Sequence, residues 1–538
     1  MPRFLKLFQR FVALCCCLAL LSAALCGCGR KAHGKAVSWL LSDTPKNLDP
    51  QTAAEAGELM VIKNCFAGLF SKSQDGTLYS DTLREWSVST DGLRYTFYLE
   101  PDRFWSAFQD GKLQKADSVT ADDFAFALRR VFTDRPGAEV LRTLSCLKNA
   151  DRVLAGEDVS LLGISCPDSK TLQLDLSRRC DTLTETLCDP CLFPCNEAFF
   201  KSTAGRYGLS AELLLYNGSF YLSGWGESSI KLKSNPYAAG NAGHPEAVTL
   251  YLPKKTRLPE ELLANGAIDA SLLSADQYDR LQNPGKYTVS KSSAILWALI
   301  FNPNDPLWQN ADLRSALFYG ADRSAGGEDT HLTQTRALVS DTAQLYGKNY
   351  RELQPAVVAP KYDRDTAQAR CQSAFASLGL RELYKADILV PDRALIRDRF
   401  SALNQIYQRD LSLYFSPTVL SEQTLLSRVK SGDFSAALVP LSVLYDSPEC
   451  ILSYFDQSQP ACLLPLTAPA YTDAMQEARR QSGNAAAAAA AYARAEQQLL
   501  SSALALPLFC ENQYFVTSAR STGFMRDFGG SVLFAAVR

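Results

Sequence analysis

The chain has 538 residues, of which 47% are hydrophobic and 21% charged, and its formal net charge is −2 at neutral pH. This composition is typical of a globular protein, and the length exceeds the roughly 250–300 residues that one hydrophobic core sustains, so we expect more than one lobe. The near-neutral charge argues against a nucleic-acid binder, which usually carries a basic face.

The N-terminus has the pattern of a secretion signal. Three basic residues within the first ten precede an apolar run over 11–26 that ends in small residues. The run is shorter than the roughly 20 residues that cross a bilayer. We therefore expect residues 1–27 to be a cleaved signal peptide and 28–36 a linker.

The end of this signal, Leu25-Cys26-Gly27-Cys28, resembles a bacterial lipobox with Cys28 as the lipidated residue. Several acyl chains on one cysteine make a lasting anchor, whereas one chain binds a membrane only marginally. We expect attachment to the outer face of the bacterial cytoplasmic membrane, on the periplasmic side in a Gram-negative cell. Secretion with a free Cys28, or cleavage before Cys26, stays open.

Of the sixteen cysteines, eleven follow Cys28. A cluster at 180, 188, 191 and 195 includes one C-x2-C, but no second pair and no nearby histidine complete a zinc set. One disulfide within the cluster, or a set of buried free thiols, also fits this pattern. With three histidines in the chain and no hydrolase, Walker or dinucleotide motif, we expect no enzyme, no metal and no cofactor.

Residues 37–42 read as a first strand, and 60–70 read as a helix with apolar residues on one face. An alternating strand at 95–99 follows an Asp-Gly turn, and Thr120 precedes a helix with Asp122 and Asp123 in its first turn.

From about residue 365 helices alternate with strands, which predicts βαβ units and a largely parallel sheet. We expect helices at 365–378, 393–408 and 421–431, and strands at 386–390, 411–416 and 436–439. Seven alanines at 485–491 predict a long helix, because alanine is the best helix former.

Segments across nearly the whole mature chain, taken in order, resemble the family 5 solute-binding proteins of ABC importers, the oligopeptide, dipeptide and nickel binders. They are Leu48-Asp-Pro-Gln51, Asn64-Cys-Phe-Ala-Gly-Leu-Phe70, Trp86-Ser-Val-Ser-Thr-Asp-Gly-Leu93, Phe104-Trp-Ser106, Val119-Thr-Ala-Asp-Asp-Phe124, Tyr216-Asn-Gly-Ser-Phe-Tyr-Leu222, Ile300-Phe-Asn302, Leu313-Arg-Ser-Ala-Leu-Phe-Tyr-Gly-Ala-Asp-Arg323, and Leu506-Pro-Leu508. No single segment is specific, but their order is.

The resemblance implies an α/β, two-lobed, periplasmic-binding-protein-like fold of class II, cluster C type, with discontinuous lobes, a hinge and an extra subdomain. Lobe 1 would span 37–265 with the subdomain at about 70–185. Lobe 2 would span 266–500, and 501–538 would return to lobe 1.

The resemblance also implies function: a lipoprotein that captures short peptides between its lobes and delivers them to an ABC permease with its ATPase subunits. It would act as a monomer. Strand-like recognition of the peptide backbone would use two loops, with side chains lining a pocket. The implied ligand-binding residues are Thr44, Pro45, Lys46, Tyr237, Trp297, Asn302, Leu444, Tyr445 and Asp446.

One departure affects the cargo. Peptide binders of this family typically carry an aspartate that pairs with the peptide ammonium, and Leu444 stands at that position. A desolvated ammonium without a partner is costly, so a blocked or longer peptide remains open, with Asp446 as a substitute anchor. A nickel chelate or another small molecule as cargo, and a peptide-sensing receptor without transport, also stay open.

Overall fold

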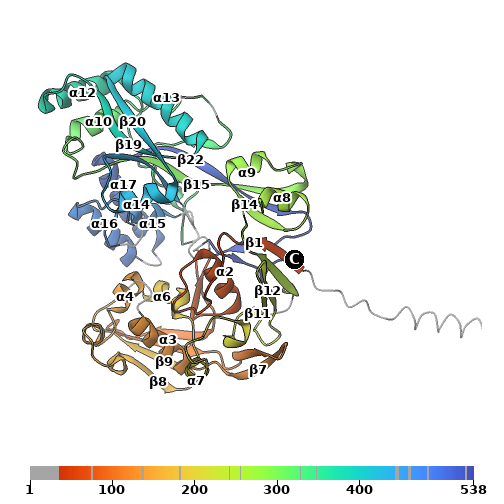
Figure 1. Cartoon of the computed structure of the whole chain (residues 1–538). Coiled ribbons are helices and arrows are strands. Elements are labelled where there is room, and N and C mark those ends of the chain that lie inside the picture. The colour runs from red at the N-terminus through yellow and green to blue at the C-terminus, as the bar shows by residue number, and fades with distance from the viewer. Residues whose placement is uncertain are drawn as a thin grey trace, which may run out of the picture.

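The structure, a computed structural model, describes residues 36–538 except 74–76, 135–137, 181–182, 241–242, 255, 328, 347, 443–446, 459–461, 482–483 and 528–529. The predicted signal peptide and Cys28 lie outside the described residues. Two bodies are visible in Figure 1, one coloured red to yellow and the other green to blue. Each has its own large hydrophobic core, so the molecule has two lobes.

Three main sheets surround the core of the first lobe. In one, β1 (Ala36–Leu40) runs parallel to β13 (Ala247–Tyr251), which continues into β12 (Ser229–Ser234) and β11 (Phe220–Trp225). The other two have the orders β4 (Leu83–Val88), β5 (Arg94–Leu99), β9 (Thr171–Asp175), β8 (Ile164–Asp168), and β10 (Leu215–Tyr216), β6 (Phe104–Gln109), β7 (Lys112–Ser118).

Short helices cover these sheets. The longest is α3 (Ala121–Asp134), which has Asp122 and Asp123 at its positive end and buries Phe124, Leu128 and Val131 on one face. The others are α2 (Ala56–Cys65), α4 (Ala138–Leu144), α5 (Ala150–Leu154), α6 (Leu183–Thr186) and α7 (Glu197–Ser202).

The predicted helix at 60–70 is wrong in its limits. A capping box between Glu55 and Glu58 starts α2 earlier, and the chain is already extended at Phe66. Phe70 begins a strand instead, β2 (Phe70–Lys72), which pairs with β3 (Leu78–Ser80).

A seven-stranded sheet organises the second lobe. Its order is β14 (Ala270–Leu273), β22 (Ala505–Ser518), β15 (Tyr287–Phe301), β21 (Ala436–Ser442), β19 (Leu383–Pro391), β20 (Leu413–Leu420), with β16 (Leu332–Gln334) also on β22. Strands β21, β19 and β20 are mutually parallel, joined through α13 (Ala394–Leu411) and α14 (Glu422–Lys430). The predicted alternation from 365 to 439 is therefore confirmed. The prediction of a largely parallel sheet is wrong, because β14, β15, β16 and β22 join the sheet through antiparallel pairs, and β15 pairs antiparallel with β21.

Helix α8 (Pro259–Ala264) precedes β14 and packs in a small separate cluster with residues of β14 and β22. The remaining helices of this lobe are α9 (Ala275–Asp279), α10 (Ala311–Tyr319), α11 (Tyr350–Leu353), α12 (Arg364–Leu378), α15 (Pro448–Leu452), α16 (Pro469–Arg480) and α17 (Ala485–Ser501). The alanine run forms the start of α17, as predicted. Ala488 and Ala489 are fully buried, and α17 lies beside α16 in Figure 1. Short two-stranded pairs are β17 (Gln344–Leu345) with β18 (Lys348–Asn349), and β23 (Met525–Arg526) with β24 (Val532–Leu533).

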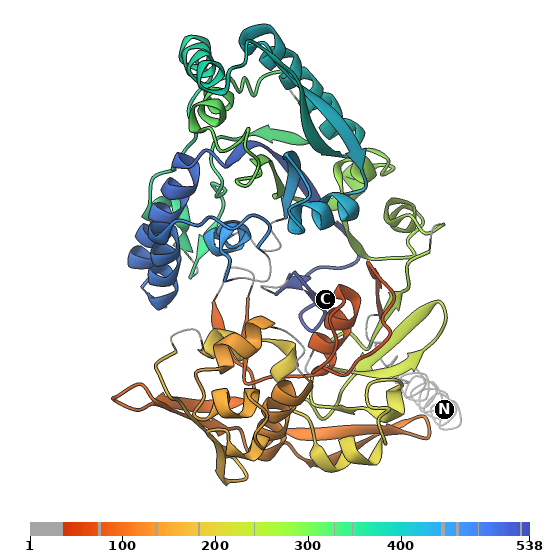
Figure 2. The ribbon, with the colours of Figure 1, turned by 60° about the vertical axis from the view of Figure 1, so that its left-hand side comes forward.

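The chain connects the lobes around Asp269, just before β14. Its side-chain Oδ2 accepts the N–H of Ser38 at 2.8 Å, and its carbonyl accepts the N–H of Ser518 at 2.7 Å. Beside it, the ring of Trp39 stacks on Phe515 with centroids 6.1 Å apart. The predicted return at 501–538 contains β22 of the second sheet, and after β22 the chain packs into the first core. Figure 2 shows the blue C-terminal segment beside the red elements of the first lobe.

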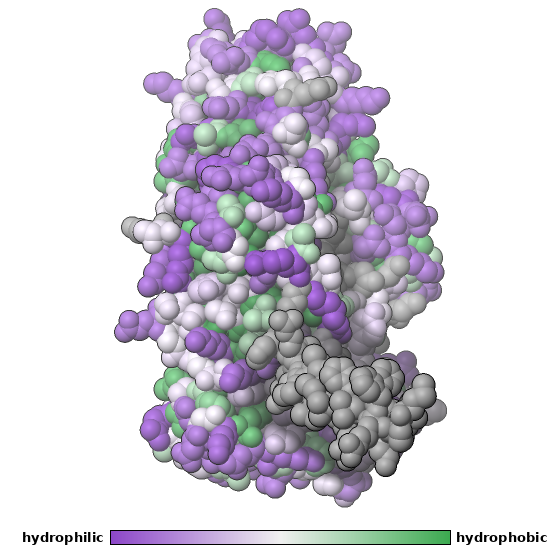
Figure 3. Space-filling view, turned by 90° about the vertical axis from the view of Figure 1, so that its right-hand side faces the viewer, coloured by the Kyte–Doolittle hydropathy of each residue, from purple (hydrophilic) through white to green (hydrophobic). Residues whose placement is uncertain are grey.

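The face of the molecule in Figure 3 is mostly hydrophilic, with hydrophobic residues scattered between polar ones. Among the described residues, no helix is long and apolar enough to cross a membrane.

Candidate ligand-binding site

The second lobe gathers polar groups at one edge of its sheet. Strands β19, β20 and β21 are parallel, so their carboxyl ends share this edge, where ligands of open α/β sheets bind. Arg393 follows β19, and Glu422 follows β20. The segment that follows β21 holds Leu444, Tyr445 and Asp446, which lie outside the described residues.

An ion cluster, in which Glu511 is buried and Arg393 and Glu422 are partly exposed, occupies this edge. Arg393 pairs through Nη2 with Oε1 of Glu511 and lies 3.5 Å from Oε1 of Glu422. The other oxygen of Glu511 accepts the indole N–H of Trp297 at 2.9 Å. Ile295 pairs with both Ser442 and Glu511, so Glu511 is level with the last residue of β21. The cluster thus lies beside Ser442, where β21 ends and the segment that leads to Pro448 begins.

Trp297 itself is fully buried in β15. Its ring lies 5.8 Å from the guanidinium carbon of Arg393, and its N–H is bonded to Glu511. In this structure the indole packs near Arg393 and donates to Glu511, so it helps to hold the ion cluster in place. Its predicted contact with a ligand stays a prediction.

Asn302 lies at the opposite edge of the same sheet. It follows β15, whose last residue Phe301 pairs with Ala436 at the amino end of β21. Its side-chain amide donates to the carbonyls of Gly432 at 3.1 Å and Phe434 at 2.7 Å. The structure does not bring Asn302 to the ion cluster.

In the first lobe, Thr44–Lys46 connects β1 to α2. Thr44 and Lys46 are exposed, whereas Pro45 is buried. The N–H groups of Lys46 and Asn47 each donate to Oε1 of Glu58 at 3.0 Å. The segment is therefore fixed to the first turn of α2.

Glu58 organises this segment, and the sequence analysis missed it. Its second oxygen accepts the N–H groups of Ala54 and Glu55 at 3.2 and 3.3 Å. Burial opposes ionisation of Glu58, but the four backbone donors outweigh it and lower its pKa. Its spacing of three from Glu55, a capping-box pattern, is the signal that would have identified it.

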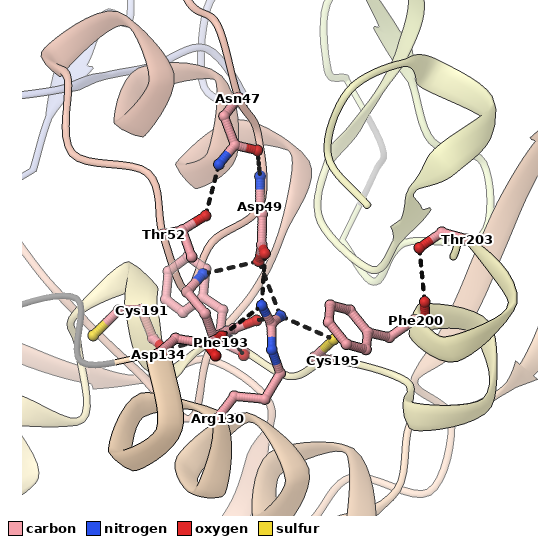
Figure 4. Close-up of polar contacts among 11 residues, drawn as sticks. Asn47, Asp49, Thr52, Arg130, Asp134, Cys191, Phe193, Cys195, Phe200 and Thr203 are labelled. Atoms are coloured by element: carbon pink, nitrogen blue, oxygen red, sulfur yellow. Dashed lines mark hydrogen bonds and ion pairs between the residues drawn. The ribbon is translucent and has the colours of Figure 1, made fainter. Parts of the chain in front are cut away.

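A second anchor lies directly after this segment. Figure 4 shows Arg130 of α3 directed at Asp49, with Nη2 to Oδ2 at 2.6 Å and Nη1 to Oδ1 at 3.0 Å. Gln51 and Asp134 accept further bonds at 2.7 and 2.9 Å, and the ring of Phe200 lies 4.0 Å from the guanidinium. Burial opposes the charge, but Asp49 raises the pKa of Arg130 above its usual value.

Tyr237 lies elsewhere on the first lobe. It follows β12, at the end of the sheet where β1 begins, whereas Thr44–Lys46 follows the end of β1. Its N–H donates to Oδ1 of Asn235 at 3.1 Å, and the side chain is half-buried. The structure does not join it to the Thr44–Lys46 segment.

Two lobes, each with an α/β core, and polar groups at the carboxyl edge of one sheet define the class of two-lobed solute-binding proteins. The chain belongs to the bacterial extracellular solute-binding proteins, family 5, whose sequence model, described as the middle part of that family, matches residues 77–461. Members of this family are binding proteins, so the chain is a binding protein and not an enzyme.

Three known proteins illustrate the similarity. The oligopeptide-binding protein SarA of Streptococcus gordonii is 26% identical over 65% of this chain and 58% of its own length, so the chain spans less than two thirds of that relative. The probable deoxycholate-binding periplasmic protein YgiS of Escherichia coli is 22% identical over 86% of each chain. The substrate-binding domain of an oligopeptide ABC transporter from Bacillus anthracis matches with a TM-score of 0.68 at 21% identity, covering 94% and 99% of the two chains.

This last match covers both lobes. The predicted α/β, two-lobed, periplasmic-binding-protein-like fold is confirmed.

Proposed function

We propose that the chain binds short peptides between its lobes and delivers them to the permease of an ABC importer, which works with its own ATPase subunits. The observation that carries the proposal is membership of family 5, together with oligopeptide-binding relatives. The ligand would shift the balance toward a closed form by binding that form more tightly.

The segment Thr44–Lys46 of the first lobe favours one kind of contact with a ligand. Lys46 already gives its N–H to Glu58, and Pro45 has none, so this stretch offers more carbonyl oxygens than N–H groups to a ligand. A peptide has backbone N–H groups to meet them. The second edge would be the segment Ser442–Pro448, which begins beside Glu511.

The ion cluster of the second lobe affects how the N-terminus of a bound peptide could be recognised. Glu511 is buried and already pairs with Arg393 and Trp297, and Leu444 replaces the expected aspartate. A free ammonium would have to compete with Arg393 for Glu511. We therefore propose that peptides with a blocked N-terminus, or longer peptides, bind better than short free ones.

Native mass spectrometry of the protein purified from its host in detergent tests the cargo. A ladder of peptide masses is the expected result. Arg393→Gln removes the cation that competes for Glu511, so it should shift the ladder toward peptides with a free N-terminus. Arg397→Gln is the matched control, because Arg397 lies one turn beyond Arg393, in α13, and its side chain pairs only with the exposed Asp392 among its described contacts. Failure of the protein to retain or respond to any peptide in a library thermal-shift assay would refute the peptide proposal.

A non-peptide solute is the second candidate, favoured by the similarity to a probable deoxycholate-binding protein over nearly the whole chain. A single non-peptide mass in the same spectrum would select it. A peptide receptor without transport would show the peptide ladder but would not co-purify with a permease.

We also propose the lipid anchor at Cys28 and action as a monomer. For the lobes we propose the limits 37–265 and 266–518, because β22 belongs to the sheet of the second lobe and the return to the first lobe follows β22 rather than starting at 501. The expected mass of the N-terminal peptide includes acyl chains on Cys28. Cys28→Ser should lose these acyl chains, and a native N-terminal peptide without acyl chains would contradict the anchor.

A further inference from the structure

Two segments of the first lobe that carry one cysteine each lie side by side. Cys146 follows α4, and Cys180 follows β9, 34 positions later. Leu147 forms an antiparallel bridge with Leu176, and the N–H of Ser177 donates to the carbonyl of Cys146 at 2.7 Å. These contacts fix the register of the two segments.

The Cys180 side chain is directed at the segment that carries Cys146. Hydrogen bonding to Cys180, followed by burial, raises the pKa of Cys146. Cys180 Sγ also lies 4.0 Å from the carbonyl of Thr143, one turn before Cys146, and Arg178 donates to Oγ of Ser145 at 2.9 Å. Cys146 is 1% exposed, whereas Cys180 is half-buried and open to reagents.

The neighbouring cysteines face other partners. Cys188 Sγ lies 3.7 Å from the carbonyl of Thr184 on the preceding helix α6, and Cys195 Sγ accepts from Arg130 at 3.7 Å. Cys191 interacts with Asp189. Among the contacts of the described residues, the Cys146 and Cys180 thiols are the pair positioned to react.

We propose that Cys146 and Cys180 form a disulfide that joins the segment after α4 to the segment after β9. The oxidant is a disulfide compound, either a small molecule or a thiol–disulfide oxidoreductase. The Cys180 thiolate attacks one sulfur of that disulfide and releases one thiol. Cys146, losing its proton, then attacks Sγ of Cys180, which forms the internal bond and releases the second thiol. The two cysteines are oxidised, and the external disulfide is reduced to two thiols.

Peptide mapping of the full chain, purified in detergent and held with oxidised glutathione, tests the pair. Thiols are alkylated without reductant, and the chain is cut with trypsin and then with Glu-C. Trypsin isolates Cys146 between Arg142 and Lys148, and Glu-C cuts at Glu185, which separates Cys180 from Cys188, Cys191 and Cys195. The expected product is a Cys146–Cys180 linked peptide that disappears on reduction. Alkylation of both residues, or linkage of either to another cysteine, would overturn the proposal.

Stability gives a second measurement. A disulfide restricts the unfolded chain, so reduction should lower the Tm of the first lobe by several degrees. Cys146→Ser and Cys180→Ser should remove this response to reductant, whereas Cys371→Ser, a buried cysteine of the second lobe, should keep it. An unchanged response in both first-lobe variants would also overturn the proposal.

Discussion

Several side chains of this protein carry charge where little water reaches them. Arg130 is 7% exposed and Asp49 6%, and the pair ties the chain after β1 to α3. Removing one partner from such a pair leaves an uncompensated charge, which costs more than the pair itself contributes. Single substitutions should therefore lower the free energy of unfolding most where they remove one member of a buried ion pair.

We expect Arg130→Met to lower the free energy of unfolding by about 3–5 kcal/mol, because it strands the Asp49 carboxylate. Adding Asp49→Asn should restore part of the loss, since the buried charge is gone. Urea denaturation of the two single variants and the double variant measures the coupling. A double variant whose loss equals the sum of the single losses would show that the two residues act independently.

Asp81 should make stability depend on pH. Burial raises its pKa to about 6, against the opposing effects of the Gly68 N–H and Arg103. The folded state therefore holds its proton more tightly, and this stability is complete below about pH 4 and lost as the pH rises through 6. Because Asp81 as a whole residue is partly exposed, we expect the free energy of unfolding to fall by about 1–2 kcal/mol as the pH rises from 4 to 7.

The comparison for this effect is Asp81→Asn, which does not titrate. Between pH 4 and pH 7 its urea midpoint should fall less than that of the native protein. Parallel pH profiles for the two proteins would mean that Asp81 titrates at an ordinary value in the folded state.

At the scale of elements, close packing of α17 depends on its alanines. Ala488 is fully buried, whereas Ala486 is exposed on the same helix. Ala488→Leu inserts three carbon atoms into a filled space and should cost about 1–3 kcal/mol. Ala486→Leu should change stability little, because leucine and alanine both favour helices. Equal thermal shifts for the two variants would contradict this packing.

Helices and strands with a clear hydrophobic period could be predicted from the sequence, whereas contacts between individual side chains could not. The alternation from 365 to 439 was predicted because helix and strand periods change there with turn residues between them. The limits of α2 were missed because its start depends on Glu55 and Glu58 rather than on apolar spacing. The ion cluster was missed because Arg393 and Glu511 lie 118 positions apart in the sequence. The burial of Trp297 was missed because it depends on β21 and β22, which pair with β15 on either side and lie far from it in the sequence.

At the scale of the molecule, two cores with a limited connection permit relative movement of the lobes. The connection includes Asp269 with its bonds to Ser38 and Ser518, and the aromatic contact between Trp39 and Phe515. The lobe limits and ligand residues taken from the resemblance remain predictions. The two-lobed fold itself followed from the order of many short segments along the chain.

If the ligand binds both lobes, saturating ligand should reduce the radius of gyration, and small-angle X-ray scattering measures this. At a ligand concentration of 100 Kd, binding should also add about 2.7 kcal/mol to the free energy of unfolding. A thermal shift without compaction would indicate a ligand held by one lobe alone.

The last strands of the chain have a consequence for synthesis. The carbonyl of Val532 accepts from Nδ2 of Asn64 at 2.8 Å, and the N–H of Phe534 donates to the same side chain at 3.0 Å. Lys63 pairs with Asp527 at 2.5 Å, and Val537 is buried in the same core. The ribosome therefore makes the whole second lobe before it makes the pieces that complete the first. The first lobe therefore cannot complete its core until translation is nearly finished, although most of its residues are synthesised first.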